Sequence, residues 1–528
     1  MLLPDFEVKA SDLGGRICNL KTKTSEIETP ALLPVIHPVR QLVPCPDIKA
    51  MGFEAVMTNS YTTFKRLKDR ASEGIHKIID FDGTIMTDSG GYQVLEFGSV
   101  DVGPLDIARF EEQIGSDIAI ILDKPTGLNV TKRFARETVV ETLRSAELTM
   151  NSLSRNDMIW TLPIQGGRYL DLVAKSARES SKLKYGCYAL GSPVEVMEEY
   201  DFALLVRMIL AAKKYLPPDR TFHLFGAGHP LIIPLAVALG CDMFDSASYM
   251  LYAKQDRYIS STGTVRLEQL EYLACPCRIC STMTAKELKA MAKDERIKAI
   301  ATHNLFSLRR TVQETKQAIW EGRLWEYVKA NSTNHPNALN AFKLAASDSA
   351  IAFDIGTPRF KDRGIFAFDN TDLQRPEVKR FRQRIKNLDL TNKSHLIILP
   401  ETKTKPFLTS EIYHEVSRIV DPEQAVVAYV APLFGLVPAE VSDIFPLSQV
   451  TQSIQDFPKN DSLLNAKRWS RISALVKPAD PSSDWLKAEL VSYSKASSKM
   501  KGKKAKKTRI DYSRTYRALK RKIRSGID

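Results

Sequence analysis

The sequence predicts an α/β fold, a (β/α)8 TIM barrel, from a pattern repeated in the first half of the chain. Eight short apolar runs recur there, and each ends in polar or glycine residues. Segments with the pattern of helices separate most of these runs. Near-continuous apolar strands that alternate with helices indicate a parallel sheet covered on both faces. Eight such units in about 250 residues match the size of a TIM barrel, and an open doubly wound sheet is the structural alternative.

The predicted strands place a set of polar residues at one end of the barrel. The strands are expected at 31–36, 55–60, 84–88, 118–123, 159–165, 187–191, 221–226 and 243–245, with helices at 130–152, 169–181, 196–215 and 230–239. The active site of a TIM barrel lies at the C-terminal ends of its strands. We therefore expect one rim to carry Asp88, Asp123, Gln165, Gly191, Gly226 and Asp245.

The third predicted strand ends in the most informative motif of the chain, which runs from Thr84 to Val94. The strand delivers the carboxylate of Asp88, and Ser89 and two glycines follow it directly. A charge at the end of a buried strand costs free energy unless something uses it. Glycine lets a ligand approach the bare backbone. The motif therefore indicates a functional site, and a helix cap at Asp88 is the ordinary alternative.

Length and composition predict a soluble protein of several domains. At 528 residues, of which 44% are hydrophobic, the chain is too long for one core and suggests about two to four domains. The N-terminus has no signal-peptide pattern, and the longest weakly charged apolar stretch, 230–244, is too short to cross a bilayer. We therefore expect a cytoplasmic protein without a membrane partner.

Most of the net charge of +13 lies in the last residues of the chain. Residues 495–528 contain fourteen Lys and Arg against two Asp, so the rest of the chain is nearly neutral. Such a segment can neutralise RNA phosphates, and Tyr512 and Tyr516 can stack on bases. A disordered solubilising arm is the alternative.

A cysteine cluster after the last predicted strand indicates a metal site. Cys275, Cys277 and Cys280 lie within six residues, and His303 follows downstream. Three thiolates and an imidazole suit tetrahedral Zn2+, and a closed ligand set favours a structural role. Seven cysteines, an odd number, also argue against a disulfide framework. The alternatives are cysteines that pack as small hydrophobes and a His303 that caps a helical pattern at 305–322.

Together these residues resemble the tRNA-guanine transglycosylases over about residues 5 to 330. The motifs that carry the resemblance are Thr87-Asp-Ser-Gly-Gly-Tyr-Gln93, Gln165-Gly-Gly167, Leu190-Gly-Ser-Pro193, Phe244-Asp-Ser-Ala-Ser-Tyr249 and the cysteine cluster with its downstream histidine. Segments 190–196 and 244–249 and the long C-terminal extension are similar to the archaeal, archaeosine-forming branch. The resemblance implies a zinc-containing TIM barrel that replaces a guanine in tRNA with a 7-deazaguanine. In the archaeal branch it implies 7-cyano-7-deazaguanine (preQ0) as the incoming base and position 15 of the D arm as the target.

The resemblance also implies roles for two aspartates. Base exchange at the ribose C1′ with retained configuration needs a carboxylate nucleophile and a second carboxyl group that moves protons. By similarity Asp245 is the nucleophile, through a covalent glycosyl-enzyme, and Asp88 is the general acid/base. The sequence alone does not fix which aspartate takes which role. The two carboxyl groups should lie about 5 Å apart, as in retaining glycosidases.

The base-binding residues follow from the resemblance as well. Asp123 is expected to accept hydrogen bonds from N1–H and the 2-amino group of a guanine-like base, with Ser89 and Gln165 adding further bonds. A loop cap at Asp123 and a plain turn at 165–167 are the ordinary alternatives. The backbone N–H groups expected to meet O6 and the nitrile of preQ0 belong to Gly191, Ser192 and Val194.

The expected domains are a catalytic barrel over 1–332 with its zinc site at 275–303, a helical linker over 333–390, a small α/β accessory domain over 391–490 and a basic tail over 491–528. Family members pair through the zinc region, so the resemblance implies a homodimer. No PUA RNA-binding domain is recognised, so we expect the basic tail or a separate chain to help hold the tRNA.

Three other functions fit parts of the sequence. A queuosine-type transglycosylase would act at another tRNA position. A non-catalytic tRNA-binding barrel subunit would have lost its carboxylates, whereas Asp88, Asp123 and Asp245 are all present. A metal-dependent hydrolase would want paired histidines at strand ends, and the few histidines here are scattered.

Overall fold

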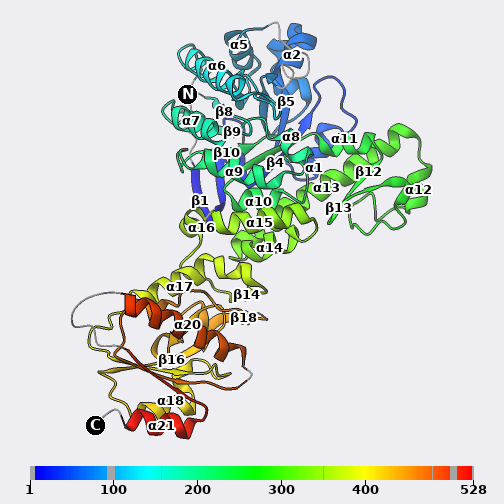
Figure 1. Cartoon of the computed structure of the whole chain (residues 1–528). Coiled ribbons are helices and arrows are strands. Elements are labelled where there is room, and N and C mark those ends of the chain that lie inside the picture. Colours follow the sequence, from blue (N-terminus) through cyan, green and yellow to red (C-terminus); the bar gives the residue numbers. More distant parts are fainter. Residues whose placement is uncertain are drawn as a thin grey trace. The chain divides into compact units, whose positions relative to one another are not determined.

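Two compact units make up the chain in this computed structural model, Met1–Pro358 and Arg359–Asp528 (Figure 1). The structure describes residues 6–91, 102–155, 157–348, 350–453, 455–478, 480–499 and 508–525. Tyr92, Gln93 and Val94, the last residues of the motif that begins at Thr84, lie outside these ranges.

A closed barrel of eight parallel strands, in the order β10-β11-β4-β5-β6-β7-β8-β9, forms the centre of the first unit. Each predicted strand is present, so the TIM barrel is confirmed and the open doubly wound sheet is excluded. The bounds are β4 Ala31–Ile36, β5 Ala55–Asn59, β6 Thr84–Asp88, β7 Ile118–Ile120, β8 Ile159–Ile164, β9 Cys187–Leu190, β10 Thr221–Leu224 and β11 Met243–Ser246.

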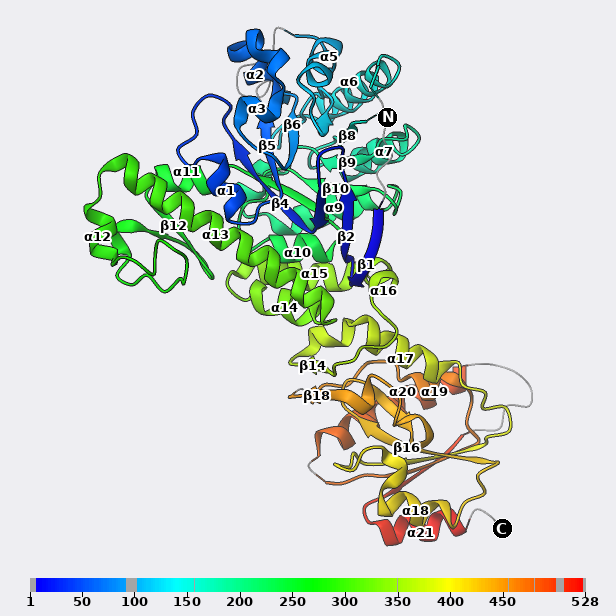
Figure 2. The same ribbon diagram turned by 180° about the vertical axis from the view of Figure 1, so that it is seen from behind.

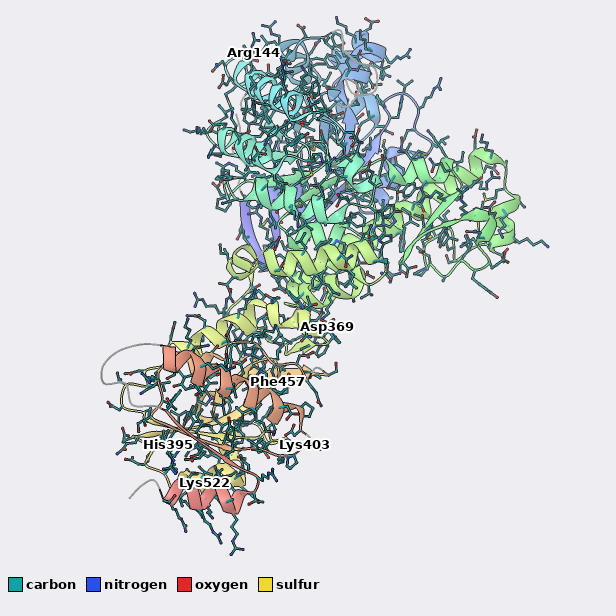
Figure 3. All side chains as sticks on the ribbon, in the orientation of Figure 1. Arg144, Asp369, His395, Lys403, Phe457 and Lys522 are labelled. Atoms are coloured by element: carbon teal, nitrogen blue, oxygen red, sulfur yellow. The ribbon has the colours of Figure 1, made fainter. Side chains whose placement is uncertain are left out.

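Helices follow the strands and cover the outside of the barrel, as Arg144 on α6 illustrates in Figure 3. Their starts are capped locally: the Thr131 side chain accepts from the Phe134 N–H, and Asp201 accepts from the Leu204 N–H. The helix predicted at 196–215 is two helices, because Tyr200 between them adopts a left-handed φ of 57°. The bounds are α1 Cys45–Ala50, α2 Ser60–Leu67, α3 Ile75–Ile79, α5 Pro104–Ile114, α6 Lys132–Met150, α7 Leu170–Ser180, α8 Val194–Glu198, α9 Phe202–Lys213, α10 Ile233–Ala238 and α11 Ser248–Lys254.

A small antiparallel sheet covers the N-terminal end of the barrel. It consists of β1 Phe6–Asp12, β2 Gly15–Lys21 and β3 Glu26–Thr29, and β2 lies beside the barrel in Figure 2. Leu20 and Ile27 of this sheet belong to one buried cluster with the first residues of several barrel strands, including Ala55, Ile118 and Ile159. The sheet therefore closes the end opposite the polar rim and leaves that rim as the open mouth.

The first unit extends beyond the predicted limit at 332. Its later elements are β12 Arg257–Ser260, β13 Gly263–Arg266, α12 Ala285–Ala290, α13 Lys293–Trp320, α14 Leu324–Ser332, α15 Pro336–Asp348 and α16 Ala350–Gly356. Ala338, Ala341 and Phe342 of α15 are buried in the core of the barrel unit, and the Phe342 ring lies 5.2 Å from that of Trp325. Because this apolar face packs on the barrel, the predicted linker over 333–390 is divided at Pro358, and its first part belongs to the barrel unit.

The second unit is an α/β domain with its own core. Its five-stranded sheet has the order β17-β16-β15-β19-β20, in which only the β16–β17 pair is antiparallel. The strands of this sheet are β15 His395–Leu399, β16 Ala425–Ala431, β17 Gly435–Pro438, β19 Arg471–Leu475 and β20 Arg509–Ser513. Two further strands, β14 Ile365–Ala367 and β18 Val450–Gln452, form a separate parallel pair. The helices are α17 Pro376–Lys386, α18 Glu411–Ser417, α19 Ser462–Ala466, α20 Pro481–Lys499 and α21 Tyr516–Arg524.

Part of the predicted basic tail is folded. β20 pairs in parallel with β19, and α21 buries Leu519 and Ile523 against the second unit. A disordered arm is therefore wrong for residues 508–525, while residues 500–507 lie outside the described ranges. The sequence misses β20 because its side chains, Arg509 to Ser513, are mostly polar, as an edge strand allows.

Among the helices in the described ranges, none is both long and apolar enough to span a bilayer.

Candidate active site and metal centre

The polar residues predicted for one rim lie at the C-terminal ends of the barrel strands. Asp88 is the last residue of β6, and Asp245 is the next-to-last residue of β11. Gln165 and Gly191 directly follow β8 and β9. Because the strands are parallel and the barrel is closed, these residues share one mouth.

Asp245 is held by two donors on one oxygen. His223 Nε2 lies 2.8 Å from Asp245 Oδ1, and the Gly226 N–H donates to the same oxygen at 2.9 Å. Since a carboxylate oxygen only accepts, His223 Nε2 carries the proton in this contact. Both bonds fall on Oδ1, and no hydrogen bond from the described residues reaches Oδ2, so Oδ2 is the oxygen available to a substrate.

Asp88 has a pKa suited to proton transfer. Burial and, to a smaller extent, the charge of Asp245 raise the pKa of Asp88, hydrogen bonds from Asn59 and the Gly90 N–H lower it, and the net pKa is about 6. Asn59 Nδ2 donates to Asp88 Oδ2 at 2.7 Å, and Ser60 Oγ donates to the Asp88 carbonyl at 2.9 Å. The two aspartates lie close enough for the charge of Asp245 to raise the pKa of Asp88.

Asp123 and Gln165 form one hydrogen-bonded pair on the other side of the mouth. Gln165 Nε2 donates to Asp123 Oδ2 at 2.5 Å. The amide is fixed in this orientation because Gln165 Oε1 accepts from the N–H of Thr126 at 3.0 Å and from its hydroxyl at 2.9 Å. Burial raises the pKa of Asp123, the hydrogen bond from Gln165 lowers it, the charge of Asp88 raises it, and the net pKa is about 7.

Two glycines make room for this pair. A Cβ at Gly91 would lie 2.3 Å from Asp123 Oδ1, and a Cβ at Gly191 would lie 2.3 Å from Gln165 Nε2. Neither distance is possible for a larger residue without displacing the pair. The N–H of Gly191 donates to the Ile164 carbonyl at 3.0 Å. This N–H is therefore used within the barrel, whereas the resemblance implied that it would bind the base.

The remaining predicted residues brace the mouth. The hydroxyl of Ser89 donates to the Ile121 carbonyl at 3.0 Å, and Ser89 is almost fully buried. The hydroxyl of Ser192 accepts from the Thr126 N–H at 3.0 Å and lies 3.2 Å from Gln165 Oε1. Val194 begins α8, where its methyl group lies against Gly226, next to Asp245.

Three residues with direct roles in this geometry are missed by the sequence prediction. His223 orients Asp245, Asn59 holds Asp88, and Thr126 fixes Gln165. The sequence does contain a signal for His223. It is a histidine inside an apolar strand, and a buried imidazole requires a hydrogen-bond partner. Asn59 is the next-to-last residue of the predicted strand at 55–60, so its polar side chain near a strand end is a similar signal to that of Asp88, and Thr126 carries no distinguishing signal.

The predicted metal ligands come together at a separate place in the first unit. The ligand atoms of Cys275, Cys277, Cys280 and His303 all lie within 4.8 Å of one another, so this group could hold a metal ion. His303 Nδ1 is 3.6 Å from the Cys277 sulfur and 3.4 Å from the Cys280 sulfur. A tetrahedral zinc ion, with Zn–S of about 2.3 Å and Zn–N of about 2.0 Å, needs separations of about 3.5 to 3.8 Å.

The surroundings of His303 fit a ligand and not a helix cap. The residue lies inside α13, which begins at Lys293, so the capping alternative is wrong. Its Nε2 contacts the Ile259 carbonyl at 2.8 Å, which places the proton on Nε2 and leaves Nδ1 unprotonated toward the thiols. The Tyr258 ring stacks on the imidazole at 3.6 Å, and its hydroxyl lies 3.2 Å from the Cys280 sulfur.

The fold and the mouth define a class: a TIM-barrel protein with paired carboxylates at the C-terminal rim and, elsewhere, a group of three cysteines and a histidine that could hold a metal ion. The model of the family described as "Queuine tRNA-ribosyltransferase" matches residues 11–337. The chain therefore belongs to the queuine tRNA-ribosyltransferase family.

Curated relatives extend the match into the second unit. A protein of Sulfolobus acidocaldarius named "tRNA-guanine(15) transglycosylase" is 39% identical over 453 residues, which cover 85% of this chain and 89% of the relative. A protein of the same name from Aeropyrum pernix is 44% identical over 379 residues, covering 71% of this chain and 74% of the relative. One from Methanocaldococcus jannaschii is 39% identical over 456 residues, covering 84% and 68%.

Proposed function

We propose that this protein is a tRNA-guanine ribosyltransferase that replaces the guanine at position 15 of tRNA with preQ0. One observation carries the proposal: Asp88 and Asp245 lie at the same rim, and the charge of Asp245 contributes to the raised pKa of Asp88. The names of the curated relatives support guanine exchange in tRNA, and their number 15 supports the target position. The incoming base rests on the resemblance to the archaeosine-forming branch.

In the first step Asp245 acts as the nucleophile. Its Oδ2 attacks C1′ of the target guanosine while the bond from C1′ to N9 breaks, which gives an aspartyl-ribosyl intermediate and inverts the configuration. The leaving guanine needs a proton, and Asp88 with its pKa of about 6 can donate one. His223 and the Gly226 N–H hold Asp245 Oδ1 in place during this attack.

In the second step the incoming base attacks C1′ from the opposite face. Its N9 loses a proton to Asp88, the bond from C1′ to Asp245 breaks, and the second inversion restores the β configuration. Both carboxyl groups then return to their starting states. The predicted separation of about 5 Å between them belongs to this retaining mechanism.

Base selection is assigned to the pair of Asp123 and Gln165. An anionic Asp123 accepts from N1–H and the 2-amino group that guanine and preQ0 share, so the same site serves the outgoing and incoming bases. Ser89, Ser192 and Val194 are assigned to the walls of this site. The Gly191 N–H is engaged with Ile164, so its contribution is the space it leaves for Gln165.

The cluster of three cysteines and His303 is proposed to hold one Zn2+ in a structural role. Bound there, the ion would tie the Cys275–Cys280 segment to α13 and supply no chemistry at the rim. We also propose a homodimer that pairs through this region, as the resemblance implies, and a cytoplasmic location, where tRNA is modified.

Exchange of labelled guanine into unmodified tRNA tests the proposed activity. The wild type should incorporate label, preQ0 should chase it out irreversibly, and guanosine-15→adenosine tRNA should take up none. Asp245→Asn should lower the rate at least about 1000-fold, because it removes the nucleophile. A wild type that binds tRNA but incorporates neither base would instead favour the non-catalytic subunit.

A further inference from the structure

A basic cavity lies at the rim, away from the residues assigned to the base. It has a volume of about 690 Å³. The described residues that line it are His37, Val39, Arg40, Tyr61, Thr62, Lys65 and Arg66, and none of these seven carries a carboxylate. The lining residues come from the loop after β4 and from α2, which follows β5.

The strand order places this cavity between the two catalytic aspartates. Around the barrel, β4 and β5 lie between β11, which carries Asp245, and β6, which carries Asp88. Asp123, Gln165 and Gly191 follow β7, β8 and β9, on the remaining side of the mouth. A nucleoside with its C1′ at Asp245 and its base toward β7–β9 therefore directs its sugar-phosphate backbone toward β4 and β5.

The charges around the cavity suit an anion. Burial lowers the pKa of His37, and the positive charges of Lys254, Arg40 and Arg66 lower it further, so these three cations face one imidazole. Arg40, Arg66 and Lys254 form no ion pair with a carboxylate in the part of the chain that the structure describes. Like charges at this spacing repel one another, and an anion bound between Arg40, Arg66 and Lys254 would relieve that repulsion.

His37 is prepared to donate a hydrogen bond. Its Nδ1 accepts from the N–H groups of Val39 and Arg40, each at 3.1 Å, so the proton of the neutral ring is on Nε2. A donor Nε2–H beside arginine side chains is a combination that binds phosphate oxygens.

The cavity is also connected to the reacting centre. Asn59 caps α2, because its Oδ1 accepts from the Thr62 N–H at 2.7 Å, and its Nδ2 holds Asp88 at 2.7 Å. An anion bound by Arg66 and Tyr61 would therefore contact α2, the helix whose N-cap residue also positions Asp88.

From these observations we infer that the cavity binds a backbone phosphate of the RNA next to the target nucleoside, with Arg40, Arg66 and His37 as its main contacts. This inference rests on the proposed function, because it takes RNA as the substrate. It assigns β4 and β5 to the backbone and leaves β7–β9 to the base.

A charge-matched set of variants provides the first test. The double variant Arg40→Gln/Arg66→Gln should weaken tRNA binding about 10- to 100-fold, because two charge-assisted contacts are lost. The slope of log K against log salt should become shallower by about 2. Binding of labelled free guanine should not change. Arg40→Lys/Arg66→Lys should retain most of the affinity, and Lys175→Gln/Lys214→Gln, which removes two exposed charges from the outer helices, should have no effect.

Replacing one backbone phosphate with an uncharged analogue identifies which phosphate of the RNA the cavity binds. A methylphosphonate is placed in the tRNA either 5′ or 3′ of the target guanosine, and binding is measured with the wild type and the double glutamine variant. One of the two substitutions should weaken wild-type binding about tenfold and have no further effect on the variant. Equal losses for both proteins at both positions, or no loss at either, would overturn the inference.

These outcomes separate the inference from the proposed function. A wild type that exchanges guanine while the double variant keeps its tRNA affinity rejects the cavity alone. A wild type that shows the methylphosphonate effect without any exchange rejects the activity and retains the cavity as an RNA site.

Discussion

Asp88 combines burial, a neighbouring negative charge and two hydrogen-bond donors, the Asn59 amide and the Gly90 N–H, and the balance raises its pKa to about 6. The protonated form is the one that can give a proton to a leaving guanine. In a single turnover with tRNA, formation of the covalent adduct should therefore slow about tenfold per pH unit above pH 6. Adduct retained on a denaturing gel between pH 5 and 8 measures this. Asp88→Asn should be slow and independent of pH, whereas a wild-type rate that rises through pH 6 would contradict the acid role.

Asp123 carries a stability cost that depends on pH. The ordinary pKa of an aspartate, 3.8, applies to the unfolded chain, and the pKa of Asp123 in the folded protein is about 7. The folded protein therefore holds the proton more tightly than the unfolded chain. Folding is therefore not penalised below pH 4, and the penalty grows as pH rises to 7, to on the order of 2 to 4 kcal/mol. Asp123→Asn, which stays neutral, should unfold at a higher temperature than the wild type at pH 8.

Thermal unfolding at pH 8 and at pH 3 checks this expectation. The two proteins should differ at pH 8 and converge at pH 3, which lies below the ordinary pKa of 3.8, so that Asp123 is mostly neutral in the folded and the unfolded state. An Asn variant that is less stable than the wild type at pH 8 would show that Asp123 is held as an anion by the fold.

For individual residues, the sequence identifies the polar side chains at the ends of the apolar strands. Asp88, Asp123, Gln165 and Asp245 all stand where an apolar run ends, so their burial and their shared rim follow from the pattern. The partners that orient them do not. Thr126 is close to Gln165 only after the loop beyond β7 folds over β8, and the engagement of the Gly191 N–H depends on strand pairing between β8 and β9.

The cysteine segment and α13 are two elements that an ion bound by their four ligands would tie together. Cys280→Ser should remove the bound zinc, measured as metal per chain by atomic absorption, and lower the melting temperature of the barrel unit. Tyr258→Phe is the matched variant, because it removes only the hydroxyl that contacts the Cys280 sulfur. It should keep the ion with about tenfold lower affinity. Full zinc occupancy in Cys280→Ser would contradict the ligand assignment.

Element boundaries follow the sequence where a cap or an apolar pattern marks them. α6 and α7 lie within two residues of their predicted limits, since apolar spacing and Thr131 define the first of them. The break between α8 and α9 is not visible in the sequence, because the left-handed conformation of Tyr200 is imposed by tertiary packing and not by a glycine. α13 begins well before the predicted helical pattern, since its first two turns are mostly polar.

One helix of the second unit, α21, carries a row of exposed arginines, and we predict that they bind RNA. On α21, Arg517, Arg521 and Arg524 are exposed at helical spacing, opposite the buried Leu519 and Ile523, and Figure 3 marks Lys522 on the same helix. Replacing the three arginines with Gln should weaken tRNA binding at least about tenfold and make its salt dependence shallower by about 2 to 3. The Arg→Lys triple variant should retain most of the affinity.

Fluorescence binding titrations at several salt concentrations check this expectation, with free-guanine binding as a measure of an intact barrel. Unchanged tRNA affinity in the Gln variant would assign RNA binding elsewhere and favour a separate chain that holds the tRNA. Removal of residues 508–528 is a poorer experiment, because it would also take away β20 and two core side chains, Leu519 and Ile523.

The position of β20 has a consequence for biosynthesis. Its partner β19 and the rest of that sheet leave the ribosome earlier, yet the edge of β19 stays uncovered until residues 509–513 emerge. The barrel, in contrast, is complete once residue 358 is free. The nascent chain should therefore acquire its catalytic half during translation, and its second half must wait, with an open sheet edge that chaperones are suited to shield.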